Sequence, residues 1–150
     1  MNGKERVNLS KVIEKMNLVN LTPDIDVKGI WIHVPEFNRP ALQLTGFYDQ
    51  FDNDRIQIIG NVEYSYLKSL SETERYERYM QLLSSNIPCL IFCRNLEPEA
   101  EIIELAKKYQ IPILKSEEST SSFSAEVIRW LKVQLAPCIV IHVLLVDVYG

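Results

Sequence analysis

The sequence lacks the features that most often hold nucleotides or nucleic acids. Its five glycines, at positions 3, 29, 46, 60 and 150, are isolated, and neither a GxGxxG nor a GxxxxGK[ST] pattern occurs. The 16 Lys and Arg residues form no dense block and the net charge is −4, which argues against nucleic acid or an anionic membrane as a partner. The chain as given therefore has no recognisable loop for cradling a triphosphate.

Long hydrophobic runs and paired cysteines are also scarce. The longest apolar stretch, 138–146, is interrupted by His142 and is too short to span a bilayer. The first twenty residues lack the continuous apolar run of a signal peptide. The three cysteines are an odd number and lie in apolar runs, which fits a reducing compartment better than a disulfide framework. We therefore expect a cytoplasmic protein without a membrane partner.

The hydrophobic patterns predict an α/β fold. The 150 residues are the size of one ordinary domain, and the apolar fraction of 47% is enough for one core. Strand-like runs at 88–93, 111–114 and 139–148 alternate with two stripes of apolar residues at helical spacing. Because parallel strands need a crossover helix, this order predicts a small mixed or parallel sheet with flanking helices.

The first half of the chain has less regular patterns. Asn8 is a suitable N-cap for a helix that begins at Leu9. Strands are predicted at 27–34 and 55–60, and the stretch 35–54 between them, with two prolines and several Asn and Asp, is predicted to be a long ordered loop. Ser71 and Glu74 have the spacing of a capping box, which predicts the start of a helix with a stripe at Tyr76, Tyr79, Met80 and Leu83.

Few side chains stand out as chemical groups. Cys89 and Cys93 share one face of a predicted strand but lie about 13 Å apart at strand rise, so we interpret them as core residues, not metal ligands. His33 and His142 are the only histidines; each is more simply a packed residue, with catalysis as the alternative. The acidic residues near the start of one predicted helix are interpreted as a solvated helix N-terminus: Glu97, Glu99, Glu101 and Glu104. Asp147 is expected on the polar side of the last strand.

Several segments, in the same order, resemble the front domain of bacterial HPr kinase/phosphorylases. Residues 38–49 (NRPALQLTGFYD) resemble the family motif RPGLxLTGF(Y/F)D, and RIQIIG at 55–60 resembles the segment that follows it. The other matches are LKSLSETE at 67–74, NLEP at 95–98 and LAP at 135–137 with HVLLVDVYG at 142–150. Ala41 and Val143 replace family glycines, which puts the geometry at these positions in question if either needs a positive φ.

This resemblance implies more than the residues alone do. The fold is expected to be similar to the small N-terminal domains of the muramyl-peptide ligases. Residues 1–134 would form the non-catalytic front domain, and residues 135–150 the linker and first strand of a truncated kinase domain. The intact protein would phosphorylate a serine of the phosphocarrier HPr with ATP or pyrophosphate and Mg²⁺, and reverse the reaction by phosphorolysis, in control of carbon catabolite repression.

The resemblance assigns one catalytic residue, His142, which would act near the transferred phosphate in the intact protein. No cofactor-binding or metal-binding residue is expected in this chain, so the chain alone is predicted to be inactive and to serve assembly or regulation. The family implies HPr as a partner through the missing domain, and a homo-oligomer, in the family a hexamer. The alternative hypothesis is a free-standing sensor of a small ligand or an interaction module.

Overall fold

The computed structural model describes residues 5–136, which fold around a five-stranded sheet. Strands β4 to β7 are parallel to one another, and β2 pairs with β7 in the antiparallel sense. The order across the sheet is β2 (Val19–Asn20), β7 (Ile113–Lys115), β6 (Leu90–Phe92), β5 (Ile56–Ile59) and β4 (Phe37–Asn38). A small antiparallel pair, β1 (Val7–Asn8) with β3 (Trp31–Ile32), lies beside it. The prediction of an α/β fold with a small mixed or parallel sheet is thus confirmed, and the sheet is a mixed one.

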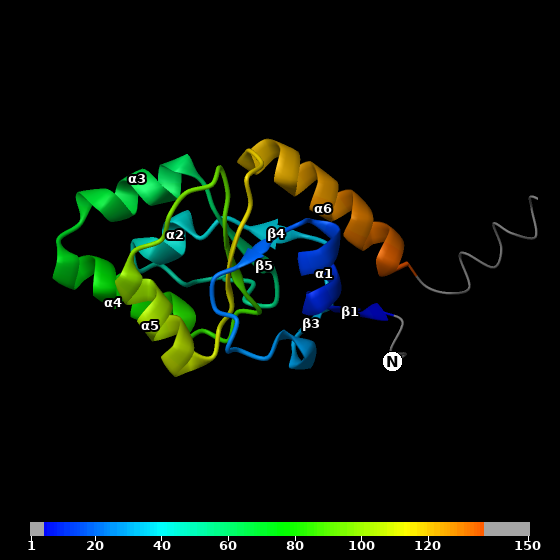
Figure 1. The fold of residues 1–150 in the computed structure, drawn as a ribbon. Helices are drawn as coiled ribbons and strands as arrows, with labels where there is room; N and C mark the ends of the chain where they lie inside the picture. Colours follow the sequence, from blue (N-terminus) through cyan, green and yellow to red (C-terminus); the bar gives the residue numbers. More distant parts are fainter. Residues whose placement is uncertain (1–4, 137–150) are drawn as a thin grey trace, which may run out of the picture.

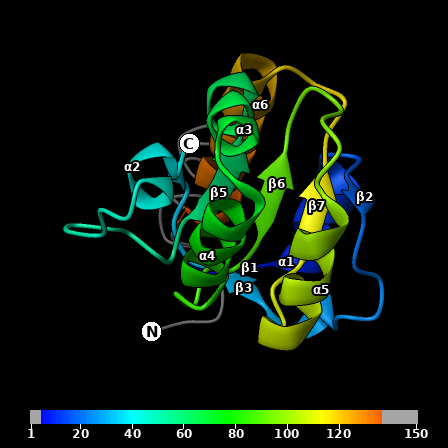
Figure 2. The ribbon, with the colours of Figure 1, turned by 90° about the vertical axis from the view of Figure 1, so that its left-hand side faces the viewer.

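Helices cover both faces of the sheet (Figures 1 and 2). One face carries α1 (Leu9–Lys15) and α6 (Thr120–Gln134), and the other carries α3 (Asn61–Ser69), α4 (Glu72–Leu83) and α5 (Ala100–Tyr109). The short helix α2 (Ala41–Leu44) follows the edge strand β4. Alternate residues of the central strands serve separate cores, since Ile58 packs with the α1 and α6 side and Ile59 with the α3 to α5 side.

The predicted caps are present. The Asn8 side chain accepts a hydrogen bond from the Ser10 N–H at 3.0 Å, and the Ser71 hydroxyl accepts one from the Glu74 N–H at 3.1 Å. The Glu74 carboxylate then accepts the Ser71 hydroxyl proton at 3.1 Å. These bonds satisfy N–H groups that have no partner within the helix, which is why the two helices begin where the sequence predicts.

Several predictions of extended structure or of a buried helix face were wrong. The predicted strand 27–34 is a 3₁₀ turn, Val27–Gly29, followed by the two residues of β3, because Asp26 accepts from the Lys28 N–H at 2.9 Å and turns the chain. The predicted loop 35–54 contains β4 and α2. In the predicted stripe at Tyr76, Tyr79, Met80 and Leu83, Tyr76 is exposed on α4, and the buried face of this helix is formed by Tyr79, Leu82 and Leu83.

Other predictions lie outside the described residues. These are the strand 139–148, the catalytic candidate His142, Val143 and Asp147. The boundary at residue 134 coincides with the end of α6 at Gln134, but the division into 1–134 and 135–150 stays a prediction.

Candidate functional site

Open α/β sheets bind ligands at the carboxyl ends of their strands, which makes this edge of the sheet a candidate site. Arg39 follows β4, Gly60 follows β5 and Arg94 follows β6, and the first turn of α6 reaches the same edge. The segments 38–49 and 55–60, singled out in the sequence, therefore meet at this edge.

An ion pair between a partly exposed arginine and a buried glutamate joins the end of β4 to the first turn of α3. Arg39 Nη2 lies 2.8 Å from Glu63 Oε1, and the same oxygen accepts the backbone N–H of Gly60 at 2.7 Å. The side chain of Glu63 is 3% exposed and that of Arg39 is 37% exposed. Glu63 holds the reach-back position of a capping box at the start of α3, so its two hydrogen bonds compensate its burial. Glu63 was not predicted to be a site residue. Its position three residues after Gly60, which ends a predicted strand, is the spacing of a capping box and could have indicated it.

Gly60 allows α6 to approach the end of β5. A Cβ atom at this position would lie 2.6 Å from Thr120 Oγ1 and 2.7 Å from Arg39 Nη2. Both distances are shorter than any ordinary contact of a carbon atom with nitrogen or oxygen. These two neighbours therefore occupy the space that a side chain at Gly60 would need.

The loops after β6 and β7 close over the end of β6. Arg94 and Asn95 are both left-handed, with φ of 58° and 57°. Their N–H groups donate to Glu118 O and Ser116 O, each at 2.8 Å. The start of the NLEP segment at 95–98 is thus hydrogen-bonded to the loop after β7, an arrangement that we call the clamp. The backbone N–H groups of Arg94 and Asn95, which would face a phosphate at this strand end, are already paired.

Side-chain amides connect the motif at 38–49 with the strand that follows it. Asn38 Nδ2 donates to Gln57 Oε1 at 2.7 Å and to Gln43 Oε1 at 3.2 Å. Gln57 is fully buried in β5, and its Nε2 donates to Arg55 O at 2.9 Å. Three amides from β4, α2 and β5 therefore satisfy one another. This network gives the Asn38, Gln43 and Gln57 positions of the two motifs a structural role.

Three of the four acidic residues near the start of α5 are paired, contrary to our interpretation of the group as a solvated helix end. Glu99 accepts the Tyr79 hydroxyl proton at 2.9 Å, and its other oxygen lies 3.4 Å from Arg75 Nε. Glu101 lies 2.8 Å from Arg75 Nε, and Glu97 contacts Lys115. Burial, then the Glu99 charge, raises the pKa of Tyr79, so its hydroxyl keeps its proton and remains a donor. Glu104 alone of the four is exposed without an ion pair in the described part of the chain.

Both described cysteines behave as core residues. Cys89 and Cys93 are buried free thiols, and burial raises their pKa to about 12 and about 11. Within residues 5–136, no group of three or more His, Cys, Asp and Glu side chains is placed to hold a metal ion. The interpretation of Cys89 and Cys93 as packed residues is confirmed.

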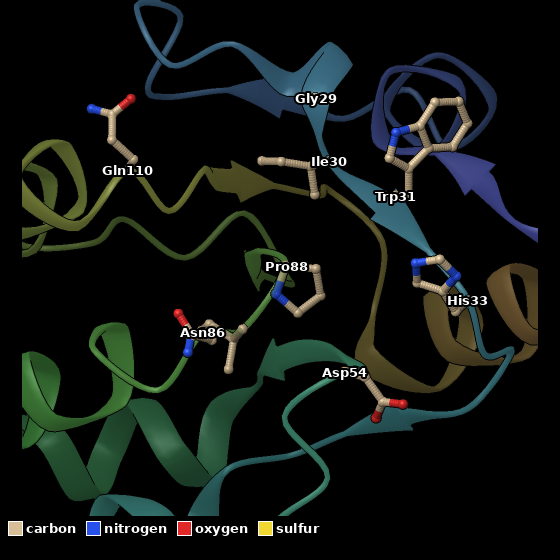
Figure 3. Close-up of a pocket in the computed structure, with 9 residues that line it drawn as sticks. Gly29, Ile30, Trp31, His33, Asp54, Asn86, Pro88 and Gln110 are labelled. Carbon is tan, nitrogen blue, oxygen red and sulfur yellow. The ribbon is translucent and has the colours of Figure 1, made fainter.

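His33 lines a cavity of about 320 Å³ at the amino end of the parallel strands (Figure 3). Trp31, Asp54, Asn86 and Gln110 also line it. Figure 3 shows that the polar ends of Asp54, Asn86 and Gln110 point in different directions, and that the Trp31 ring is turned away. The Arg6 guanidinium instead stacks on the Trp31 indole, with its Cζ 3.8 Å from the ring centre. The lining therefore lacks the convergent polar groups that define a specific ligand site.

Comparison with known proteins shows the family to which this chain belongs. A family model described as "HPr Serine kinase N terminus" matches residues 7–131. The chain belongs to this family. A protein named HPr kinase/phosphorylase from Lachnoclostridium phytofermentans is 54% identical over 144 residues, covering 96% of this chain and 47% of that protein. One of the same name from Alkaliphilus metalliredigens is 40% identical over 144 residues, covering 96% and 46%.

The chain spans about half the length of the curated HPr kinase/phosphorylases it matches. A solved structure of the CBS and DRTGG domains of the regulatory region of Clostridium perfringens pyrophosphatase superposes with a TM-score of 0.53 at 17% identity. It covers 81% of this chain and 46% of that one, and it supports the fold alone. No helix in residues 5–136 has the length and hydropathy needed to cross a membrane.

The HPr kinase N-terminal fold also explains one of the two glycine replacements. Ala41 is the first residue of α2 and has no positive φ, so alanine is compatible with the backbone here. The glycine that the turn does need is Gly46, with φ of +98°. Val143 lies outside the described residues.

Proposed function

We propose that this chain is the non-catalytic amino-terminal part of a bifunctional HPr kinase/phosphorylase. The intact protein would phosphorylate a serine of HPr with ATP or pyrophosphate and Mg²⁺, and would remove the phosphate by phosphorolysis in control of carbon catabolite repression. In this proposal the amino-terminal domain contributes to assembly of a homo-oligomer or to regulation. The family match over residues 7–131 supports the parent activity.

The closed carboxyl edge of the sheet is the observation that supports a non-catalytic role. Phosphoryl transfer depends on a backbone cradle and on metal ligands that neutralise the charge of the phosphates. Here the Arg39–Glu63 pair, the Gly60–Thr120 approach and the clamp at residues 94–95 occupy the place where an α/β cradle would form. These contacts support the proposal that residues 5–136 do not bind ATP with Mg²⁺, and no catalytic step is assigned to them.

The test is a phosphorylation assay with two proteins. This chain, at micromolar concentration, is incubated with HPr, Mg²⁺ and either ATP or pyrophosphate, and phosphoserine is measured by intact-mass spectrometry. A full-length relative such as the Lachnoclostridium phytofermentans protein is the positive control. We expect phosphorylated HPr with the control and none with this chain. Phosphorylation by this chain would overturn its non-catalytic role.

His142 is proposed to act only in an intact protein, by hydrogen bonding or proton exchange near the transferred phosphate. Replacing the histidine that aligns with His142 by alanine in the full-length relative should lower the turnover number by about 10²-fold or more. An unchanged turnover number would remove His142 from the catalytic residues.

A further inference from the structure

The junction between α2 and α4 holds a second cluster of polar groups, distinct from the closed edge of the sheet. The turn after α2 is left-handed at Gly46, which is exposed. Arg78 of α4 lies over this glycine, because a Cβ atom at Gly46 would be 3.2 Å from Arg78 Nη1. The motif at residues 38–49 thus ends on the guanidinium group of a residue from another helix.

Two buried donors at this junction have no acceptor in the described part of the protein. Arg78 Nε and the Tyr48 hydroxyl are both buried and unpaired. The Ser85 hydroxyl lies close enough to Tyr48 to lower its pKa, but the two hydroxyl groups do not meet hydrogen-bond geometry. Since buried donors are nearly always paired, what this cluster needs is an acceptor.

The charge at the junction is also uncompensated. Arg39, Arg55 and Arg75 each lie within 4.0 Å of a carboxylate, whereas no carboxylate of residues 5–136 lies that close to Arg78. On its own helix, Glu77 makes no ion pair in the described region, and one oxygen of Glu74 is bonded to Ser71. Burial raises the pKa of Tyr48 to about 12, although the Arg78 charge acts in the opposite direction, so the phenol stays protonated at neutral pH.

We propose that Arg78, Tyr48 and the turn at Gly46 form an oxyanion-binding site for a phosphate or carboxylate group. An arginine and a protonated phenol supply donors only, and an oxyanion supplies acceptors only, so the two sets are complementary. The oxyanion would approach the guanidinium group of Arg78 from the side of Gly46, because Gly46 has no side chain to cover that group. Leu42 and Phe47, which are 60% and 49% exposed, flank this turn and offer an apolar surface to the rest of the ligand.

The test is a titration of this chain followed by amide NMR shifts. Sodium phosphate and, separately, sodium acetate are added up to tens of millimolar at pH 7, with sodium chloride adjusted to hold the ionic strength constant. We expect saturable shifts of the Gly46, Phe47 and Tyr48 amides with one or both anions. Saturation by phosphate alone identifies a phosphoryl ligand, and saturation by both identifies a site that also accepts a carboxylate. The absence of saturable shifts with either anion would overturn the proposal.

Three variants locate the site. Arg78→Gln should weaken the apparent affinity at least tenfold, and Tyr48→Phe should weaken it severalfold while removing a single oxygen. Arg129→Gln, an exposed arginine of α6 on the opposite face of the sheet, is the matched control and should leave the affinity unchanged. Equal weakening in Arg78→Gln and Arg129→Gln would show general charge attraction and would overturn the site. Because the wild-type titration decides the proposal first, a variant that fails to fold does not leave it open.

Discussion

Replacing Gly60 by alanine should destabilise the fold, while the same change at Gly29 should not. Gly60 has a negative φ of −111°, so alanine meets no backbone strain there. The cost is steric, since the new Cβ atom would lie 2.6 Å from Thr120 Oγ1 and 2.7 Å from Arg39 Nη2. A Cβ atom at Gly29 would have nothing within 4 Å, which makes Gly29→Ala a matched control.

The magnitude follows from what has to move. Overpacking of this kind costs about 1–3 kcal/mol. Displacing Arg39 would add to it, because Glu63 would then stay buried with the Gly60 N–H as its one remaining donor. We expect Gly60→Ala to lower the free energy of unfolding by about 2–4 kcal/mol, and Gly29→Ala to change it by less than about 0.5 kcal/mol.

Urea denaturation followed by circular dichroism measures both changes. For a domain with a slope of about 2 kcal/mol/M, a loss of 2 kcal/mol lowers the urea midpoint by about 1 M. The second mutation Thr120→Ala, added to Gly60→Ala, should recover part of the loss, because it removes the nearer of the two clashing atoms. Equal midpoints for Gly60→Ala and Gly29→Ala would refute the close approach of α6 to β5.

The remaining predictions concern the amide network and the buried thiols. Asn38→Ala should cost about 1–3 kcal/mol, because Gln57 Oε1 stays buried without its donor. Asn53→Ala, which removes an exposed amide, should cost less than about 0.5 kcal/mol. Urea midpoints check both, and equal costs would count against the network. Cys89 and Cys93 should resist iodoacetamide at pH 8 in the folded protein and react in urea, as peptide mass spectrometry would show. Burial raises the pKa of the two thiols to about 12 and about 11, so their contribution to stability is complete below about pH 9, the pKa of an unperturbed thiol. It is lost as pH rises towards 11–12, and urea midpoints that do not fall between pH 8.5 and 10.5 would contradict this.

Local signals in the sequence were enough for the α/β alternation and for several helix starts. Asn8 and the Ser71–Glu74 pair cap helices where their spacing predicted. The second of the two apolar stripes that alternate with the predicted strands supplies the buried face of α6, at Phe123, Val127 and Leu131. Helix α3 escaped prediction, because its nine residues, Asn61–Ser69, have just two buried side chains, Glu63 and Leu67. A polar helix that packs through so few residues has no apolar stripe to detect.

The candidate sites were harder to predict, because they depend on contacts between residues far apart in the chain. Arg39 and Glu63 are 24 residues apart, and Gly60 and Thr120 are 60 apart, so no spacing rule connects them. The acidic run at 97–104 was misinterpreted for the same reason, since Arg75 and Tyr79, which neutralise and bury part of it, come from α4. Composition placed these carboxylates at a helix end, and tertiary packing decided that they are paired.

The motif at residues 38–49 combines two physical roles. Its first half is internal structure: Asn38 and Gln43 join the amide network, and Arg39 holds the buried Glu63. Its second half leaves donors unmatched, since the Tyr48 hydroxyl and the Nε of Arg78, the arginine that lies over Gly46, have no hydrogen-bond partner in the described residues. A purely structural motif would be expected to satisfy its own buried donors, as the first half does. This contrast within one continuous segment supports the proposal of a bound oxyanion at residues 46–48.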